Sequence, residues 1–271
     1  MTIEEAIIYG KKYISSTEAK MLISSVKNYN ALDIINHLNE KLTEEEEKTF
    51  KSLITSRKEN KPIQYITNNV NFYGIELYVD ENVLIPRFET EELVENTIQY
   101  LNKMFVSPKI LDLCCGSGAI GIALKNKLKL SSITMSDISN KALDVARKNI
   151  NTYNYDIEII ESDLFGKIND KFDCIISNPP YIKDDEEIEE IVKNNEPNIA
   201  LYGGKDGLDF YERILKEVKN YLNDKFLIAF EIGATQKEDI ITIANKYLSN
   251  IEIETKKDLS GRDRMVFIYN K

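Results

Sequence analysis

The sequence predicts an α/β protein in which a mostly parallel sheet, covered by helices on both faces, follows a small all-helical region. Strand and helix patterns alternate from about residue 91 to the end of the chain. Strand segments such as 110–113 and 174–176 are almost continuously apolar, with Asp112 as the exception, and such runs are typical of a sheet buried on both faces. Before residue 57, apolar residues recur instead at the spacing of amphipathic helices.

The N-terminal part is expected to be a helical domain over residues 1–69. Its apolar side chains recur at helical intervals between residues 3 and 57. The segment 43–46, Thr-Glu-Glu-Glu, has the form of a capping box and opens a further helix. From 70 to 85 the residues become aromatic and β-branched around Gly74, which predicts a β-hairpin linker.

The rest of the chain, residues 86–271, is expected to form the α/β domain. Its patterns predict helices over 91–103, 118–128, 140–151, 207–222 and 235–247, and strands over 109–114, 132–137, 156–160, 172–177, 225–232, 250–255 and 264–269. Strands joined through helices run parallel. The last two strands have little chain between them, so we expect an antiparallel hairpin at one edge of the sheet.

Composition and charge narrow the classes of function. The 271 residues include 35 Lys and Arg against 45 Asp and Glu, and this net charge of −10 disfavours nucleic-acid binding, which needs clustered positive charge. Three cysteines are too few for a disulfide framework, and the start of the chain does not resemble a secretory leader. We expect a cytoplasmic protein that contacts neither membrane nor nucleic acid, and a monomer. The single histidine, His37, argues against zinc catalysis and Ser-His chemistry.

A glycine-rich turn follows the first strand of the predicted α/β domain. Gly116, Gly118 and Gly121 fit the pattern G-x-G-x-x-G, in which glycines let the backbone approach a ligand at a helix N-terminus. This pattern fits a dinucleotide and fits S-adenosylmethionine equally well. A tight turn without a ligand is the structural alternative.

Aspartates follow the next two strands. Asp137 ends a strand about 20 residues beyond the glycine turn, where a carboxylate can accept a hydrogen bond from a ribose hydroxyl. The alternative for Asp137 is an N-cap for the next helix. Asp163 can accept from an adenine amine, with Leu164 and Phe165 as apolar cover, or it is simply a solvated loop residue.

The most informative pattern is Asn178-Pro179-Pro180-Tyr181, directly after an apolar strand. The prolines stiffen the chain and hold Asn178 in an extended conformation. The Asn178 side-chain carbonyl and the Pro179 backbone carbonyl are two acceptors that suit a planar NH₂ group. Tyr181 adds a ring face for the group that bears it. A loop turn with an exposed tyrosine is the alternative, but the carboxyl end of a parallel strand favours a ligand site.

The glycine turn together with Asn-Pro-Pro-Tyr resembles the amino-methyltransferases, which transfer a methyl group from S-adenosylmethionine to an amide or exocyclic amine nitrogen. Within that class the chain is similar to the release-factor glutamine N5-methyltransferases. The segments that carry the similarity are 57–66, 72–74, 83–94, 196–197, 200–208, 231–233 and 261–264. The family usually has Gly-Thr at 114–115, proline at 88 and Thr-Gly at 67–68, where this chain has Cys-Cys, Phe and Thr-Asn.

The resemblance implies a helical N-terminal domain, a hairpin linker and a Rossmann-like methyltransferase domain. It implies that the substrate is the glutamine of the Gly-Gly-Gln motif of peptide chain release factors, so that the enzyme modulates translation termination. The cofactor would be S-adenosyl-L-methionine, held by Cys114, Cys115, Gly116, Ser117, Gly118, Asp137, Asp163, Leu164 and Asn178. The glutamine amide would be held by Asn178, Pro179, Pro180 and Tyr181, of which Asn178, Pro179 and Tyr181 would be catalytic. Because of the Cys-Cys departure, the role of those two side chains stays open.

Three other functions remain open. An adenine N6-methyltransferase acting on DNA or RNA would use the same Asn-Pro-Pro-Tyr pattern, but the net charge of −10 and the segment 83–94 count against it. A dinucleotide-dependent dehydrogenase needs the glycine pattern and leaves Asn-Pro-Pro-Tyr unexplained. The third is a non-catalytic protein that binds S-adenosylmethionine.

Overall fold

The computed structural model describes residues 1–270, which divide into two compact units. One unit contains Met1–Asn69 and Glu189–Asn195, and the other contains Val70–Ile188 and the chain from Glu196 onward. We keep the limits 1–69, 70–85 and 86–271 as the proposed domain organisation, in which 70–85 is a linker.

The first unit is helical. Its helices are α1 (Ile3–Gly10), α2 (Ser16–Lys27), α3 (Ala31–Asn36), α4 (Glu44–Lys58), α5 (Ile63–Thr67) and α9 (Glu190–Asn195). The first four open with capping boxes, and in α4 the Thr43 hydroxyl accepts from the Glu46 N–H at 3.1 Å. Apolar side chains of α1, α2 and α4 form its buried core. Helix α9 buries no residue, so no apolar pattern marked it in the sequence.

The second unit begins with a hairpin of β1 (Val70–Phe72) and β2 (Ile75–Leu77), which pair antiparallel. It is shorter than the predicted stretch 70–85. The strand ends because Tyr78 bonds a side chain rather than a neighbouring strand: its N–H donates to the Asn149 Oδ1 at 2.7 Å, and the Asn149 amide donates back to the Tyr78 carbonyl at 2.9 Å.

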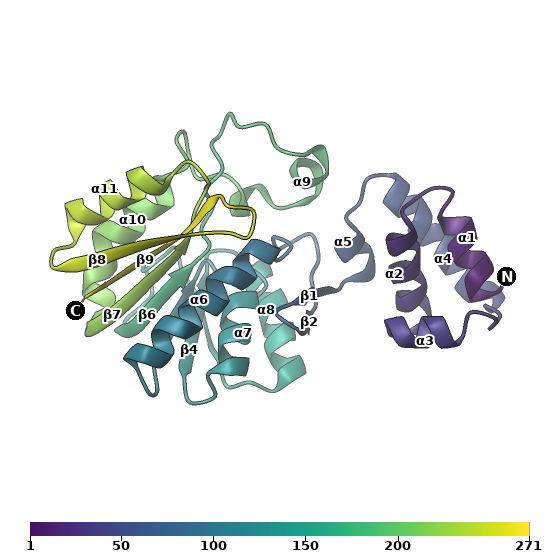
Figure 1. The fold of residues 1–271 in the computed structure, drawn as a ribbon, viewed down its shortest axis with the longest axis horizontal. Coiled ribbons are helices and arrows are strands. Elements are labelled where there is room, and N and C mark those ends of the chain that lie inside the picture. The colour runs from purple at the N-terminus through teal and green to yellow at the C-terminus, as the bar shows by residue number, and fades with distance from the viewer. Residues whose placement is uncertain (271) are drawn as a thin grey trace. The chain divides into compact units, whose positions relative to one another are not determined.

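A seven-stranded sheet forms the centre of this unit. Its strands are β3 (Lys109–Leu113), β4 (Ser132–Asp137), β5 (Glu158–Glu161), β6 (Phe172–Ser177), β7 (Leu222–Glu231), β8 (Ile251–Lys257) and β9 (Asp263–Asn270), in the order β5-β4-β3-β6-β7-β9-β8. Strands β3 to β7 pair in parallel, and β9 lies antiparallel between β7 and β8 (Figure 1). The predicted parallel sheet with an antiparallel edge hairpin is confirmed.

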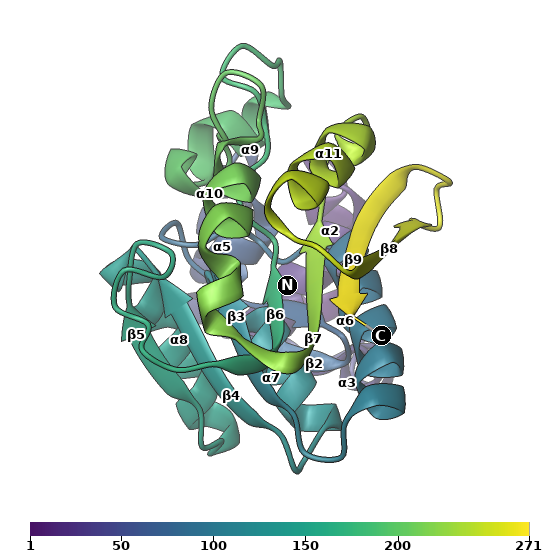
Figure 2. The same ribbon diagram turned by 90° about the vertical axis from the view of Figure 1, so that its left-hand side faces the viewer.

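Helices pack on both faces of this sheet (Figure 2). They are α6 (Phe88–Met104), α7 (Ala119–Lys127), α8 (Asn140–Tyr153), α10 (Asp209–Glu217) and α11 (Lys237–Tyr247), with the 3₁₀ turns η1 (Asn198–Ala200) and η2 (Val218–Tyr221). Because side chains alternate along a strand, Ile110 packs in one core with α6, α7 and α8, and Leu111 packs in a second core with α10 and α11. The second unit therefore has two hydrophobic cores, one on each face of its sheet.

One predicted helix, 207–222, is shorter than expected. It ends at Glu217, continues as η2, and β7 begins at Leu222 rather than at 225. At this point the Tyr221 ring stacks on Phe165, with the ring centroids 4.3 Å apart. Phe165 and Tyr221 are far apart in sequence, so the spacing of apolar residues within one segment cannot predict this contact.

Candidate functional site

A cavity of about 200 Å³ lies at the carboxyl ends of the parallel strands, where open α/β sheets bind ligands. The structure brings most of the predicted site residues together around it: Cys114, Cys115, Gly116, Ser117, Asp137, Asp163, Leu164, Asn178 and Pro180. Gly118, Pro179 and Tyr181 are not among the residues that line it. Within residues 1–270, no group of three or more His, Cys, Asp or Glu side chains is placed to hold a metal ion.

The turn after β3 is left-handed at Cys114, with φ of 63°, and again at Gly116 and Gly118. The Cys115 N–H donates to the Ser136 carbonyl at 3.0 Å, which ties the turn to β4. Burial raises the pKa of both the Cys114 and the Cys115 thiol, so each is a protonated, apolar group. Cys115 packs in the core that holds α7, and Cys114 packs against the other core. Their arrangement favours packing over redox chemistry.

Asp137 braces this turn. One carboxylate oxygen accepts from the Gly116 N–H and the other from the Ser139 N–H, both at 2.9 Å. Burial raises the pKa of Asp137. The N-cap of α8 is Ser139 rather than Asp137, because the Ser139 hydroxyl accepts from the Ala142 N–H. Each carboxylate oxygen has a second lone pair, so Asp137 can accept further hydrogen bonds from a ligand in the cavity.

Asp163 forms an ion pair that its sequence neighbourhood does not indicate. Both of its carboxylate oxygens lie 2.8 Å from the Arg213 Nη2, and Arg213, on α10, also lines the cavity. The pair is about half exposed, so its own contribution to stability is small. It orients the Asp163 carboxylate at the cavity wall next to Leu164, which is buried and has a φ of 48°.

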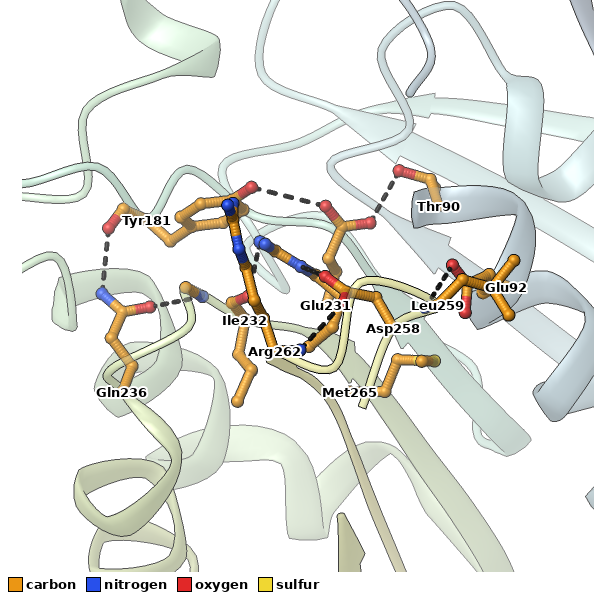
Figure 3. Close-up of polar contacts among 12 residues, drawn as sticks. Thr90, Glu92, Tyr181, Glu231, Ile232, Gln236, Asp258, Leu259, Arg262 and Met265 are labelled. Atoms are coloured by element: carbon orange, nitrogen blue, oxygen red, sulfur yellow. Dashed lines mark hydrogen bonds and ion pairs between the residues drawn. The ribbon is translucent and has the colours of Figure 1, made fainter. Parts of the chain in front are cut away.

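Asn178 is hydrogen-bonded to Thr90 and, through Thr90, to Glu231, two residues for which the sequence suggested no individual role. Its Nδ2 donates to the Thr90 Oγ1 at 3.2 Å, and the Thr90 hydroxyl donates to the Glu231 Oε2 at 2.6 Å. The Tyr181 hydroxyl lies 3.4 Å from the other Glu231 oxygen, so the carboxylate lies between two hydroxyls (Figure 3). Burial raises the pKa of Tyr181, and it raises the pKa of Glu231 to about 7.

The Asn-Pro-Pro-Tyr segment is held from several sides. The Ser177 hydroxyl donates to the Leu113 carbonyl at 2.5 Å, which joins the ends of β6 and β3. Ile182 forms an isolated parallel bridge with Tyr202. The buried Gln236 amide donates to the Tyr181 carbonyl at 2.9 Å, and Figure 3 shows this contact beside the Tyr181 ring. A segment fixed by this many bonds places Asn178 with little conformational freedom.

The Glu196 carboxylate connects two segments of the cavity wall. The buried Glu196 accepts from the Ile85 N–H at 3.1 Å and from the Arg87 guanidinium at 2.5 Å. Arg87 and Pro197 both line the cavity. Glu196 therefore joins the segment before α6 to the segment that precedes η1.

Gly207 packs closely against the backbone of Tyr181, and this packing supports a stability prediction. A Cβ at Gly207 would lie 2.2 Å from the Tyr181 carbonyl oxygen, whereas a Cβ at Gly261 would meet nothing within 4 Å. Both glycines have positive φ, of 74° and 79°, so Gly207→Ala and Gly261→Ala share the backbone strain. We expect Gly207→Ala to lower the free energy of unfolding by about 1–3 kcal/mol more than Gly261→Ala, because only the first overlaps another backbone. Urea denaturation measures both, and equal losses would contradict the close packing of Gly207 on Tyr181.

Known proteins resemble this chain over almost its whole length. The Methyltransferase small domain model matches residues 90–196, and the PrmC N-terminal domain model matches residues 12–67. The release factor glutamine methyltransferase of Streptococcus pneumoniae is 39% identical over 268 residues, covering 98% of this chain and 94% of that protein. That of Bacillus cereus is 34% identical over 279 residues, covering 98% and 99%.

Solved structures resemble the fold at lower identity. A methyltransferase from Pyrococcus furiosus has a TM-score of 0.54 at 19% identity, covering 81% of this chain and 96% of that one. A T. thermophilus 16S rRNA methyltransferase in complex with AdoMet and guanosine has a TM-score of 0.56 at 14% identity, covering 75% and 50%. These two likenesses concern the fold alone.

Proposed function

The chain belongs to the family of release factor glutamine methyltransferases, and we propose that it methylates the side-chain amide nitrogen, N5, of the glutamine in a Gly-Gly-Gln motif. It is a methyltransferase whose cofactor is S-adenosylmethionine. The observation that carries the N5 proposal is the hydrogen bonding of the Asn178 side chain. Its Nδ2 is engaged by Thr90, and within residues 1–270 its Oδ1 has no hydrogen-bond partner. That oxygen is an acceptor available to an NH₂ group in the cavity.

The chemistry needs a positioned amide. An amide nitrogen is a weak nucleophile because its lone pair is delocalised into the carbonyl. We propose that the Asn178 side-chain oxygen and the Pro179 backbone oxygen accept hydrogen bonds from the two N–H groups of the substrate amide. These hydrogen bonds raise the electron density on the amide nitrogen and orient its lone pair. Such positioning can supply about 7–11 kcal/mol in well-oriented systems. When bound, S-adenosylmethionine supplies an electrophilic methyl group on sulfur.

The residues around the cavity fit this cofactor. The turn at 114–118 has backbone in the left-handed region beside the cavity, so its atoms can approach a ligand closely. We propose that Asp137 accepts hydrogen bonds from the ribose hydroxyls. Asp163 would accept from the adenine amine, and Leu164 would cover the ring. Asn178 would contact both cofactor and substrate.

The proposed partner is a protein. We infer that the chain acts as a cytoplasmic monomer on a peptide chain release factor, without direct contact to nucleic acid, and thereby modulates translation termination. The net charge of −10 supports a protein partner over a polyanion. In residues 1–270, no helix is long and apolar enough to cross a membrane.

The test is to incubate the protein with a purified release factor and labelled S-adenosylmethionine. We expect mass spectrometry to find one methyl group on the glutamine of the Gly-Gly-Gln peptide, and none when that glutamine is replaced by asparagine. Duplex DNA and ribosomal RNA serve as competing substrates. Label in the nucleic acid, or on another residue of the release factor, would overturn the proposal.

A further inference from the structure

The Asn178 side chain can hold a substrate amide in only one of its two orientations. With Oδ1 toward the cavity it accepts a substrate N–H bond, but after a 180° turn it would present its own NH₂ to the substrate NH₂, and two donors do not bond. The two orientations have nearly the same shape. The prolines that hold the Asn178 backbone therefore do not choose between them, and a neighbouring polar group must.

Thr90 has the chemistry to make this choice. It is 4% exposed, lies on α6 and lines the same cavity as Asn178. A hydroxyl has one proton to donate. The short distance of 2.6 Å to the Glu231 Oε2 directs that proton to the carboxylate, which when ionised can only accept. The Thr90 oxygen can then only accept from Asn178, which selects the Nδ2 side of the amide, at 3.2 Å.

We propose that Thr90 and Glu231 are positioning residues, which act through Asn178 to keep its side-chain oxygen turned toward the substrate amide. The inference rests on the proposed function, because it concerns the same substrate nitrogen. Figure 3 shows the Glu231 carboxylate between the Thr90 and Tyr181 hydroxyls. Thr90 lies on α6, Glu231 at the end of β7 and Asn178 directly after β6, so these hydrogen bonds join three parts of the fold.

The protonation state of Glu231 affects the orientation of the Asn178 side chain. The groups that face it are Thr90 and Glu89 from α6, Tyr181 after β6 and Arg264 from β9, while the Tyr211 hydroxyl on α10 donates to the Glu231 backbone carbonyl at 2.7 Å. Burial and Glu89 raise the pKa of Glu231, while Thr90, Arg264 and Tyr181 lower it, which leaves it at about 7. A protonated Glu231 can donate to Thr90, whose own proton is then free to turn toward Asn178 and favour the wrong orientation.

Valine and serine at position 90 test the hydroxyl. Thr90→Val keeps the shape and removes the hydrogen bond, whereas Thr90→Ser keeps the hydroxyl. Thr97→Val is the matched control, since Thr97 is buried on the same helix and its hydroxyl donates to the Leu93 carbonyl at 2.7 Å. We expect Thr90→Val to slow single-turnover methyl transfer by about 10- to 100-fold, with Thr90→Ser and Thr97→Val within about 3-fold of the wild type.

The affinity for the cofactor separates this role from a general loss of structure. Calorimetry with S-adenosylmethionine is expected to give the same Kd for Thr90→Val as for the wild type. If Thr90→Val transfers methyl as fast as Thr97→Val, the positioning role is wrong. If the wild type itself transfers no methyl to the release factor, the proposed function fails first, so the two failures are distinguishable.

A pH profile tests Glu231. The active form is the ionised one, so the single-turnover rate of the wild type is expected to rise with pH through about 7. In Glu231→Gln the amide oxygen can still accept from Thr90 and does not titrate, so this rise should disappear. The side-chain NH₂ resonances of Asn178, assigned by their absence in Asn178→Asp, should shift over the same pH range without substrate. A rise that persists in Glu231→Gln, or resonances that do not shift, would overturn the inference.

Discussion

Replacing Asn178 with alanine is expected to lower the single-turnover rate of methyl transfer by about 10²–10³-fold, the loss typical when one preorganised polar group of a reaction centre is removed. The variant loses the proposed side-chain acceptor and leaves the substrate amide with the proposed Pro179 carbonyl acceptor alone. Pro179 and Pro180 are buried and still fix the backbone, so the segment keeps its place. Most of the loss should therefore appear in the rate rather than in folding.

The measurement is a rapid-quench time course with excess enzyme, beside calorimetry with S-adenosylmethionine. The cofactor Kd is expected to stay close to that of the wild type. Asn151→Ala is the matched control, because Asn151 is exposed on α8, away from the cavity lining. A rate equal to that of the control would show that Asn178 does not hold the reacting amide.

Asp137→Ala is expected to weaken S-adenosylmethionine binding by about 10²-fold, because hydrogen bonds to a charged group contribute about 1.5–3 kcal/mol each. The substitution removes the proposed ribose acceptor, and it also releases the Gly116 and Ser139 N–H groups that the carboxylate holds at 2.9 Å. The glycine turn then loses one of its ties to the end of β4 and keeps the backbone bond from the Cys115 N–H to the Ser136 carbonyl. Both effects lower affinity for the same ligand.

Calorimetry gives the Kd directly, and saturating cofactor should restore much of the methyl-transfer rate, since Asn178 is untouched. Asp144→Ala is the control, because Asp144 lies exposed on α8 and its carboxylate pairs with Arg147 at 2.7 Å. An unchanged Kd in Asp137→Ala would remove Asp137 from the cofactor site. A rate that stays low at saturating cofactor would instead place Asp137 in the transfer step.

Local patterns predicted the sheet closely and the connections less well. The strand predicted at 132–137 is β4 without change, because Ile133 and Met135 alternate with small polar residues at the two-residue period of a strand. The hairpin predicted over 70–85 stops at Leu77, because Tyr78 bonds Asn149 on α8. The helix predicted to reach 222 stops at Glu217. The limit of the hairpin is thus set by a partner distant in the chain.

The sequence by itself determined the parts of the site that depend on backbone conformation: the glycine turn after β3, an acid at the end of β4, and Asn-Pro-Pro-Tyr after β6. Only the tertiary structure decided how these parts are supported. Thr90 meets Glu231 across 141 positions of sequence, Arg87 meets Glu196 across 109, and Arg213 meets Asp163 across 50. The physical reason is that glycine, proline and alternating apolar residues constrain their own backbone, whereas a hydrogen-bond partner depends on which strand ends and helices the fold brings within about 3 Å.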